Sequence, residues 1–199
     1  VECDGAGNVA DLDAWLASNG GASATDACSG VTWSNDFAAL SADCGATGSA
    51  TVTFTATDDC GNATSTTATF TIEDTTAPAV VDAMDATVEC DGAGNVADLD
   101  AWLASNGGAS ATDACSGVTW SNDFAALSAD CGATGSATVT FTATDDCGNA
   151  TSTTATFTIE DTTAPAVVDA MDATVECDGA GNVADLDAWL ASNGGASAT

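Results

Sequence analysis

Apolar and polar residues alternate strictly in two neighbouring stretches of the chain, residues 51–57 and 67–72. In the first stretch, Val52 and Phe54 stand between threonines. A period of two is typical of half-buried antiparallel strands, with apolar residues facing the core and β-branched threonines facing solvent. Residues 58–62 between the two stretches form a cluster of turn-forming residues, so the two strands are predicted to form a hairpin.

A different pattern in residues 9–18 predicts a short helix. Leu12 and Trp15 stand three positions apart, which places both on one apolar face of a helix. Asn8 precedes the segment as a capping residue, and Asp11 follows it three positions later as the acid of a capping box. We expect this helix to be a lid on the edge of a β-sandwich rather than part of a ligand site.

Shorter strands are predicted over residues 22–27 and 31–35, separated by a turn. In the second of them, Val31 and Trp33 are expected to face inward. Strands separated by turns at this spacing are typical of an immunoglobulin-like β-sandwich. The predicted fold class is therefore all-β, with one short helix.

The whole pattern repeats with a period of 87 residues. Residues 1–87 and 88–174 are identical, and residues 175–199 begin the same sequence a third time. Because 87 residues is the size of a small domain, the chain is predicted to be an array of immunoglobulin-like repeats. The predicted domains are a first repeat lacking its first strand (1–74), a complete second repeat (75–161) and the start of a third (162–199).

The first and third repeats are incomplete, which bears on how the chain arose. Val1 is not an initiator residue, so we expect a processed or partial chain. The incomplete first and third repeats favour a window from a longer covalent array. The alternative is that separate chains complete one another by strand addition.

The charge of the chain restricts its partners and its chemistry. It holds 30 acidic residues and no Lys, Arg or His, a formal net charge of −30. Such a chain repels nucleic-acid phosphates and anionic lipid, and no apolar run is long enough to cross a membrane, so we expect neither partner. Without His, a Ser-His-Asp arrangement is impossible, and paired carboxylates in turns offer no deep pocket; the chain is predicted not to be an enzyme.

Four segments of each repeat carry a resemblance to a known family. They read ATDACSG, VTW, TVTFTATDDCGNAT and TIEDTTAP, and in the first repeat they occupy residues 24–30, 31–33, 51–64 and 71–78. Together they resemble the hyalin-repeat-like (HYR) modules, immunoglobulin-like sandwiches found in tandem on bacterial surface proteins. The resemblance implies an extracellular or cell-surface array used for reach, adhesion or assembly. The helix at residues 9–18 departs from the compact module and is interpreted as an insertion.

The four cysteines of each repeat predict disulfides. Their spacing contains no CxxC, which argues against a zinc site, and an even number in a small strand-rich domain is typical of an oxidising compartment. In an up-and-down sandwich the turns at Cys28 and Cys60 lie at one end, and Cys3 and Cys44 lie at the other. Of the three possible connectivities, pairing within each end is preferred. The predicted bridges are Cys3–Cys44, Cys28–Cys60, Cys90–Cys131 and Cys115–Cys147.

The same topology predicts a calcium site where successive repeats meet, because the acidic exit of one repeat faces the turn acids of the next. Flexible carboxylates are the hard oxygen ligands that Ca²⁺ prefers. At the first junction the candidate ligands are Glu73, Asp74, Asp113, Asp145 and Asp146, with Asp4 or Asp43. Further candidates toward the next junction are Glu160, Asp161, Asp91 and Asp130. The alternative is that these acids are solvated turn residues.

Two functions follow as hypotheses. The first is a structural extracellular fibre or stalk, stabilised by calcium, whose repeats associate head to tail and possibly side by side. The second is a cell-surface adhesin that binds glycan or another surface. Sugar binding favours exposed aromatic rings, and because Tyr is absent and Trp33 is expected to be buried, the exposure of Trp15 discriminates between the two.

Overall fold

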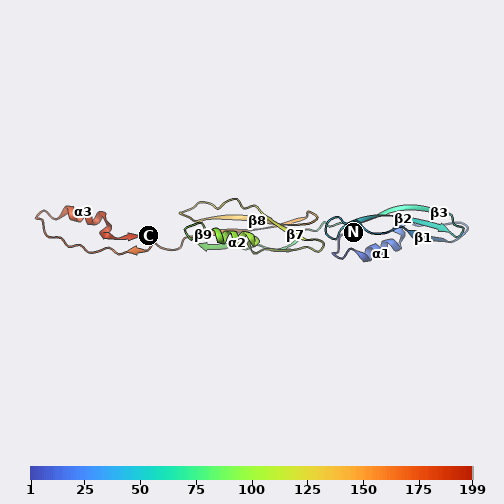
Figure 1. The fold of residues 1–199 in the computed structure, drawn as a ribbon, viewed down its shortest axis with the longest axis horizontal. Helices are drawn as coiled ribbons and strands as arrows, with labels where there is room; N and C mark the ends of the chain where they lie inside the picture. Colours follow the sequence, from blue (N-terminus) through green and yellow to red (C-terminus); the bar gives the residue numbers. More distant parts are fainter. Residues whose placement is uncertain (199) are drawn as a thin grey trace. The chain divides into compact units, whose positions relative to one another are not determined.

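The computed structural model describes residues 1–198 (Figure 1). The chain divides into two compact units, one from Val1 to Glu160 and a second that begins at Asp161. The fold is mostly β-sheet with few helices. The first unit spans the predicted first repeat (1–74) and the predicted second repeat (75–161) except for its last residue, Asp161. No helix in the described part of the chain is long and apolar enough to cross a membrane.

The sheet of the first repeat contains the predicted hairpin. Its strands, in the antiparallel order β1-β2-β3, are β1 (Val31–Asn35), β2 (Gly48–Asp58) and β3 (Ala63–Ile72). Val52 and Phe54 are buried, while the hydroxyls of Thr51 and Thr69 hydrogen-bond across the outer face at 2.8 Å. The structure therefore confirms the hairpin that the alternation predicted and the face that it buries.

The second repeat has a larger sheet, in the order β5-β9-β8-β7. Its strands are β5 (Ala86–Glu89), β7 (Val118–Asn122), β8 (Gly135–Asp145) and β9 (Ala150–Glu160). The strands β7, β8 and β9 repeat the antiparallel pairing of the first repeat, 87 residues later. The strand β5 adds to β9 in parallel, a pairing that the sequence analysis did not predict.

A separate two-stranded pair joins β4 (Ala79–Val81) to β6 (Ser110–Thr112). The equivalent of β6 in the first repeat lies within residues 22–27, where a strand was predicted. That prediction is wrong for the first repeat, because residues 22–27 form no strand there. In the second repeat β6 pairs with β4, which supplies the hydrogen bonds that keep it extended.

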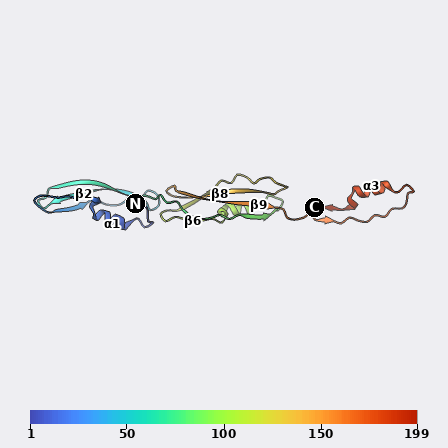
Figure 2. The same ribbon diagram turned by 180° about the vertical axis from the view of Figure 1, so that it is seen from behind.

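The predicted helix forms in both repeats, as α1 (Val9–Ala17) and α2 (Val96–Ala104), each followed by a short 3-10 turn, η1 (Asn19–Gly21) or η2 (Asn106–Gly108). Figure 1 shows α1 alongside the first sheet and α2 alongside β8, and the reverse view in Figure 2 again places α1 beside β2.

The helix belongs to the core, which corrects the expectation of a lid on a sandwich edge. Leu99 and Trp102 of α2 are each only 8% exposed and pack on β8 and β9. The Trp102 ring lies 5.2 Å from Phe141, edge to face, and 5.5 Å from Phe157. Such aromatic pairs contribute about 0.5–1.5 kcal/mol beyond the area they bury. In the first and second repeats the helix thus covers the apolar face of its sheet.

The predicted helix cap is not formed. Asn8 adopts a left-handed conformation (φ 49°), and its side chain makes no capping bond to the helix backbone. Instead, the side-chain nitrogen of Asn8 (Nδ2) donates to the Asp11 carboxylate at 3.0 Å and to the backbone carbonyl of Glu2 at 2.9 Å. Asn8 therefore ties the start of the helix to the backbone at Glu2.

The second unit contains β10 (Val167–Val168), α3 (Val183–Ala191), the turn η3 (Asn193–Gly195) and β11 (Ser197–Ala198). The strands β10 and β11 pair as β4 and β6 do. Leu186 is 52% exposed here, whereas its equivalent Leu99 is buried, because the described part of this unit contains no hairpin sheet.

Candidate functional site at the junction between repeats

Two disulfides join the first repeat to the second. Cys3 pairs with Cys115, and Cys44 pairs with Cys147, with Cα–Cα distances of 6.0 and 5.2 Å. The Cys147 sulfur also lies 3.5 Å from the backbone carbonyl oxygen of Cys44. The contact between the two repeats, which we call the junction, is therefore covalently closed at two points.

These bridges overturn the predicted pairing within repeats. Cys3 does not pair with Cys44, nor Cys115 with Cys147. Within residues 1–198, the unpaired cysteines are Cys28, Cys60, Cys90, Cys131 and Cys177, so the predicted bridges Cys28–Cys60 and Cys90–Cys131 are also not formed. The physical reason is the end-to-end contact, since each cysteine at one end of a repeat meets a partner from the opposite end of the next.

Two glycines of the first repeat allow this close approach. A Cβ on Gly5 would overlap the carbonyl oxygen of Ala114, and one on Gly45 would overlap that of Cys115. The amide of Ala46 donates to the same Cys115 carbonyl at 2.9 Å. Both glycines also have positive φ, +75° and +54°, which favours glycine on conformational grounds. Neither glycine was singled out from the sequence.

Asp74 lies at the centre of the junction with an incompletely bonded carboxylate. Its Oδ1 accepts a hydrogen bond from the Thr76 amide at 3.2 Å, whereas its buried Oδ2 has no partner. One ligand atom from each of Asp74, Asp113 and Cys115 lies within 4.8 Å of the others. The Cys115 sulfur is in a disulfide, so the two carboxylates are the anionic members of this group. They line a cavity of about 350 Å³.

The surroundings of Asp74 disfavour its charge. Burial raises the pKa of Asp74 above its ordinary value, and the negative charges of Asp113, Asp145 and Glu2 raise it further. A carboxyl group that has negatively charged neighbours and a buried oxygen without a hydrogen-bond partner is less stable in its ionised form. A cation beside this carboxylate would remove that penalty.

Glu2 is a member of this charge cluster that the sequence analysis missed. Its carboxylate accepts hydrogen bonds from the Thr75 amide and from the hydroxyls of Thr75 and Thr76, at 2.7–2.9 Å. These bonds lower the pKa of Glu2, the Thr75 amide having the largest effect. Glu2 thus stays ionised and holds the linker that carries Asp74. In the sequence, the one signal of this role is that Glu2 is an acidic residue directly before Cys3.

Asp145 is buried and supports the site through Asn149. Burial acts to raise its pKa, but hydrogen bonds outweigh burial and the pKa of Asp145 lies below its ordinary value. The donors are the Asn149 side chain and backbone, at 2.8 Å each, and the Cys147 amide at 2.9 Å. Asn149 also donates to the backbone carbonyl of Asp74 at 3.0 Å, linking the two repeats.

The remaining candidates at this junction do not join the group formed by Asp74 and Asp113. Asp146 accepts a hydrogen bond from the Gly117 amide at 3.1 Å. Asp4 accepts bonds from Ala6 and Asn8 inside its own loop. The Glu73 and Asp43 side chains are exposed. The structure therefore brings Asp74 and Asp113 together, with Asp145 close enough to influence the pKa of Asp74.

The four candidates for the next junction are described only within their own units. Asp91 repeats the loop bonds of Asp4, accepting from the amides of Ala93 and Asn95. The Asp130 amide donates to the Thr134 carbonyl, and the Glu160 carbonyl accepts from the Cys90 amide. Asp161 accepts from the Thr163 amide at 3.1 Å.

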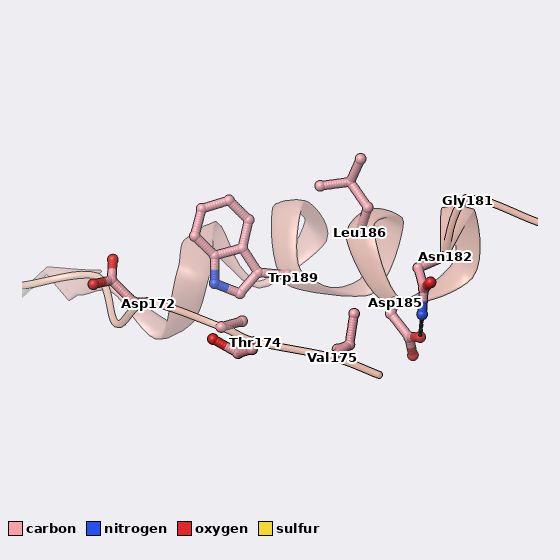
Figure 3. A pocket seen from close by; sticks show the side chains of 9 residues that line it. Asp172, Thr174, Val175, Gly181, Asn182, Asp185, Leu186 and Trp189 are labelled. Carbon is pink, nitrogen blue, oxygen red and sulfur yellow. Dashed lines mark hydrogen bonds between the residues drawn. The ribbon is translucent and has the colours of Figure 1, made fainter. Parts of the chain in front are cut away.

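A separate cavity of about 510 Å³ in the second unit lies against α3. Figure 3 shows Trp189 and Leu186 on the helix and Val175 on the neighbouring segment. The equivalents of Trp189 and Leu186 in α2 pack on the hairpin sheet. The cavity therefore marks the face that covers a sheet in the second repeat, not a preformed ligand site.

Comparisons with known proteins define no family for this chain. No protein-family model matches it, and no curated protein matches it. It is similar to solved structures of extracellular cadherin domains. The protocadherin gammaB7 EC3-6 cis-dimer matches 75% of this chain and 46% of that chain at 16% identity, with a TM-score of 0.29. Drosophila N-cadherin EC1-4 matches 68% of this chain and 42% of that chain at 14% identity (TM-score 0.29), and protocadherin gamma B2 domains 1–5 match 60% and 27% at 17% identity (TM-score 0.27). The chain spans less than half the length of these structures. At TM-scores below 0.3, the similarity carries no argument about function.

Proposed function

We propose that this chain is a structural, non-enzymatic extracellular protein whose repeats join head to tail into a fibre or stalk with calcium-stabilised junctions. The observation that carries the proposal is the junction between the first and second repeats, where two disulfides and an acidic pair meet. The HYR resemblance and the immunoglobulin-like, tandem architecture belong to the same proposal.

The disulfides support an extracellular location and a load-bearing role. Disulfides persist in oxidising compartments such as the cell exterior. Two bridges between the same pair of repeats hold them at two points, so the repeats cannot separate or rotate freely at the linker. A protein used for reach or tensile strength benefits from such restraint.

The charges support calcium as the stabilising ion. Each full repeat carries thirteen acidic residues and no basic side chain, so facing repeats repel. Asp74 and Asp113 would hold the ion, because the bare Asp74 oxygen needs a partner and both donors are hard oxygens. The ion would supply positive charge where the charged groups that act on Asp74 are now Asp113, Asp145 and Glu2. Extracellular modules bind calcium at roughly 0.1–1 mM.

The adhesin hypothesis has less support. The Trp102 indole nitrogen donates to the Met84 carbonyl at 3.1 Å, and the ring packs on two phenylalanines. Trp15 makes the same ring contacts with Phe54 and Phe70. Trp102 is buried and Trp15 is half-buried, and both rings pack on core phenylalanines, which favours a structural role for them over stacking on sugar.

A calcium titration with a matched pair of variants tests the proposal. Calcium should raise the melting temperature of the chain, and a chelator should lower it and broaden the small-angle scattering profile. Asp74→Asn should abolish this response. Asp161→Asn, at the equivalent position in the second unit, should retain it. If calcium changes neither the melting temperature nor the scattering profile of the unmodified chain, the calcium part of the proposal is refuted.

A further inference from the structure

We propose that the two disulfides at the junction limit how far the chain can be stretched and keep the first repeat free of tension. This inference rests on the proposed load-bearing role and states which part of the chain carries the load. It follows from the connectivity of the two bridges and needs no calcium.

The two bridges cross one another along the sequence. Cys44 lies between Cys3 and Cys115, and Cys115 lies between Cys44 and Cys147. The bridges span sequence separations of 112 and 103 residues. Each bridge is therefore a covalent bypass around more than half of the 199 residues of the chain.

The Cys3–Cys115 bridge gives the shortest covalent path from one end of the chain to the other, which we call the load path. The load path runs along residues 1–3, crosses the bridge and continues from Cys115. Residues 4–114 lie off this path, and they contain α1, the whole sheet of the first repeat, the linker with Asp74, and α2.

A pulling force favours only those transitions that increase the distance between the pulled ends. Unfolding of the first sheet would extend residues 4–114, but the bridge holds the Cα atoms of Cys3 and Cys115 at 6.0 Å. The end-to-end distance therefore does not change, and the force does no work on the first repeat. The first repeat should be as stable under load as it is at rest.

Few contacts have to break before the load reaches the bridge. The Cys3 amide donates to the Glu73 carbonyl at 2.8 Å, and the Glu73 amide donates to the Val1 carbonyl at 2.9 Å. The Glu2 carboxylate accepts further hydrogen bonds from the linker, and these bonds are exposed. Once this short segment detaches, tension passes directly from Cys3 to Cys115.

The load then enters the sheet of the second repeat along its strands. Cys115 lies three residues before Val118, the first residue of β7, and β9 ends at Glu160. Both β7 and β9 pair with β8 in antiparallel fashion, so the start of β7 and the end of β9 lie at opposite ends of the sheet. Because hydrogen bonds in such a sheet are perpendicular to the strands, this load acts on all bonds of a strand pair together.

The second bridge is a backup of nearly equal length. If the Cys3–Cys115 bridge is lost, the path through Cys44–Cys147 bypasses 103 residues in place of 112, which is nine fewer. At about 3.3–3.6 Å per extended residue, the path then becomes longer by about 30 Å, whereas loss of both bridges adds about 360–400 Å. Failure of one bridge therefore does not release a whole repeat.

The experiment stretches single full-length chains between peptide tags at the two ends, in a chelator. Every chain carries serine at the five unpaired cysteines, so that only the junction bridges can form. Four versions are compared: one with both bridges, one with Cys3→Ser and Cys115→Ser, one with Cys44→Ser and Cys147→Ser, and one with all four substitutions. Peptide mapping without reductant identifies the bridges in each version.

The fully stretched lengths should fall into three classes. The chain with both bridges and the chain with Cys3–Cys115 alone should have the same length. The chain with Cys44–Cys147 alone should be longer by about 30 Å, and the chain without bridges by about 360–400 Å. Equal lengths with and without bridges, or Cys3–Cys44 and Cys115–Cys147 bridges in the peptide map, would overturn the inference.

Val52 and Val139 form a matched pair that tests whether the first repeat is free of tension. They are equivalent residues of β2 and β8, and they are 1% and 0% exposed. In the chain without bridges, alanine at either position should lower the force at which its sheet unfolds, because it leaves a cavity. In the chain with both bridges, only Val139→Ala should do so. A lower unfolding force for Val52→Ala in the bridged chain would show that the first repeat carries load.

The outcome is separable from that of the calcium proposal, because the chelator is present throughout. A chain that gives the expected lengths but does not respond to calcium keeps the tether and loses the ion. A chain that responds to calcium but has equal lengths with and without bridges keeps the ion and loses the tether.

Discussion

Gly45 and Gly132 form a matched pair that isolates the contribution of close packing at the junction. The two residues are equivalent in sequence and have similar left-handed conformations, with φ of +54° and +61°. A Cβ on Gly45 would overlap the Cys115 carbonyl and lie against the Ser116 side chain, whereas a Cβ on Gly132 would meet nothing within 4 Å. Alanine therefore adds similar backbone strain at both positions but a steric clash only at Gly45.

The expected magnitude follows from that clash. Forcing an extra methyl group into a packed contact costs about 1–3 kcal/mol. Because about 1.4 kcal/mol changes an equilibrium constant tenfold, Gly45→Ala should lower the equilibrium constant for closing the junction by about 5- to 150-fold. Gly132→Ala should leave that constant unchanged, since its strain is the same whether the junction is open or closed.

The assay measures disulfide formation at the junction itself. The background chain carries serine at the five unpaired cysteines, so only the two junction bridges can form. Equilibrium with a glutathione buffer, followed by alkylation and mass spectrometry, gives the constant for closing the junction. Equal constants for Gly45→Ala and Gly132→Ala would refute the close approach seen between the repeats. Gly5→Ala against Gly92→Ala repeats the test at the second contact.

Two further predictions concern Asp74 and the helix. The pKa of Asp74 is raised in the folded chain, so this group destabilises the fold as the pH rises above its ordinary value of 3.8. With a chelator present, the Asp74→Asn variant should therefore melt at a higher temperature than the unmodified chain at pH 7. This difference in melting temperature should vanish below pH 3.8, and a difference that does not depend on pH would contradict the prediction. Leu99→Ala should lower the free energy of unfolding by roughly 2–5 kcal/mol, since Leu99 is buried, whereas Leu186→Ala should have little effect because Leu186 is 52% exposed. Similar losses for both variants in denaturant titrations would show that α2 does not belong to the core.

The hairpin was predictable because its information is local. Alternation over residues 51–57 identifies the buried face, and the turn residues at 58–62 set where the strands reverse. The structure pairs Thr57 with Ala63 and buries Phe54 as expected. No distant part of the chain is needed for this result.

The position of the helix was not predictable in the same way. The spacing of Leu12 and Trp15 shows that the helix has an apolar face, and the helix does form. The spacing does not show which surface that face covers. The contact with the sheet is between residues far apart in the sequence, such as Trp102 and Phe157.

At the junction, the sequence repeat predicted the two acids that meet, among others, but not which cysteines pair. The sequence assigned the cysteines to two opposite ends, and the structure joins such ends across the junction. For the acids, head-to-tail contact predicted a larger cluster that includes Asp74 and Asp113, and ligand atoms of these two residues lie within 4.8 Å of each other. For the cysteines it assumed that each repeat closes on itself, which gave the wrong pairs. Applying head-to-tail contact to both residue types would have paired Cys3 with Cys28 of the next repeat, which is Cys115.

The two features of the junction have different physical roles. Facing acids repel, so charge alone would separate the repeats. The disulfides act against that repulsion, because a covalent tether keeps opposite ends together whether or not a cation is present. A cation would then act on an assembled junction, where Asp74 is already surrounded by acids. The disulfides therefore hold the repeats together, and under the proposed function the acidic cluster would make the junction respond to ions.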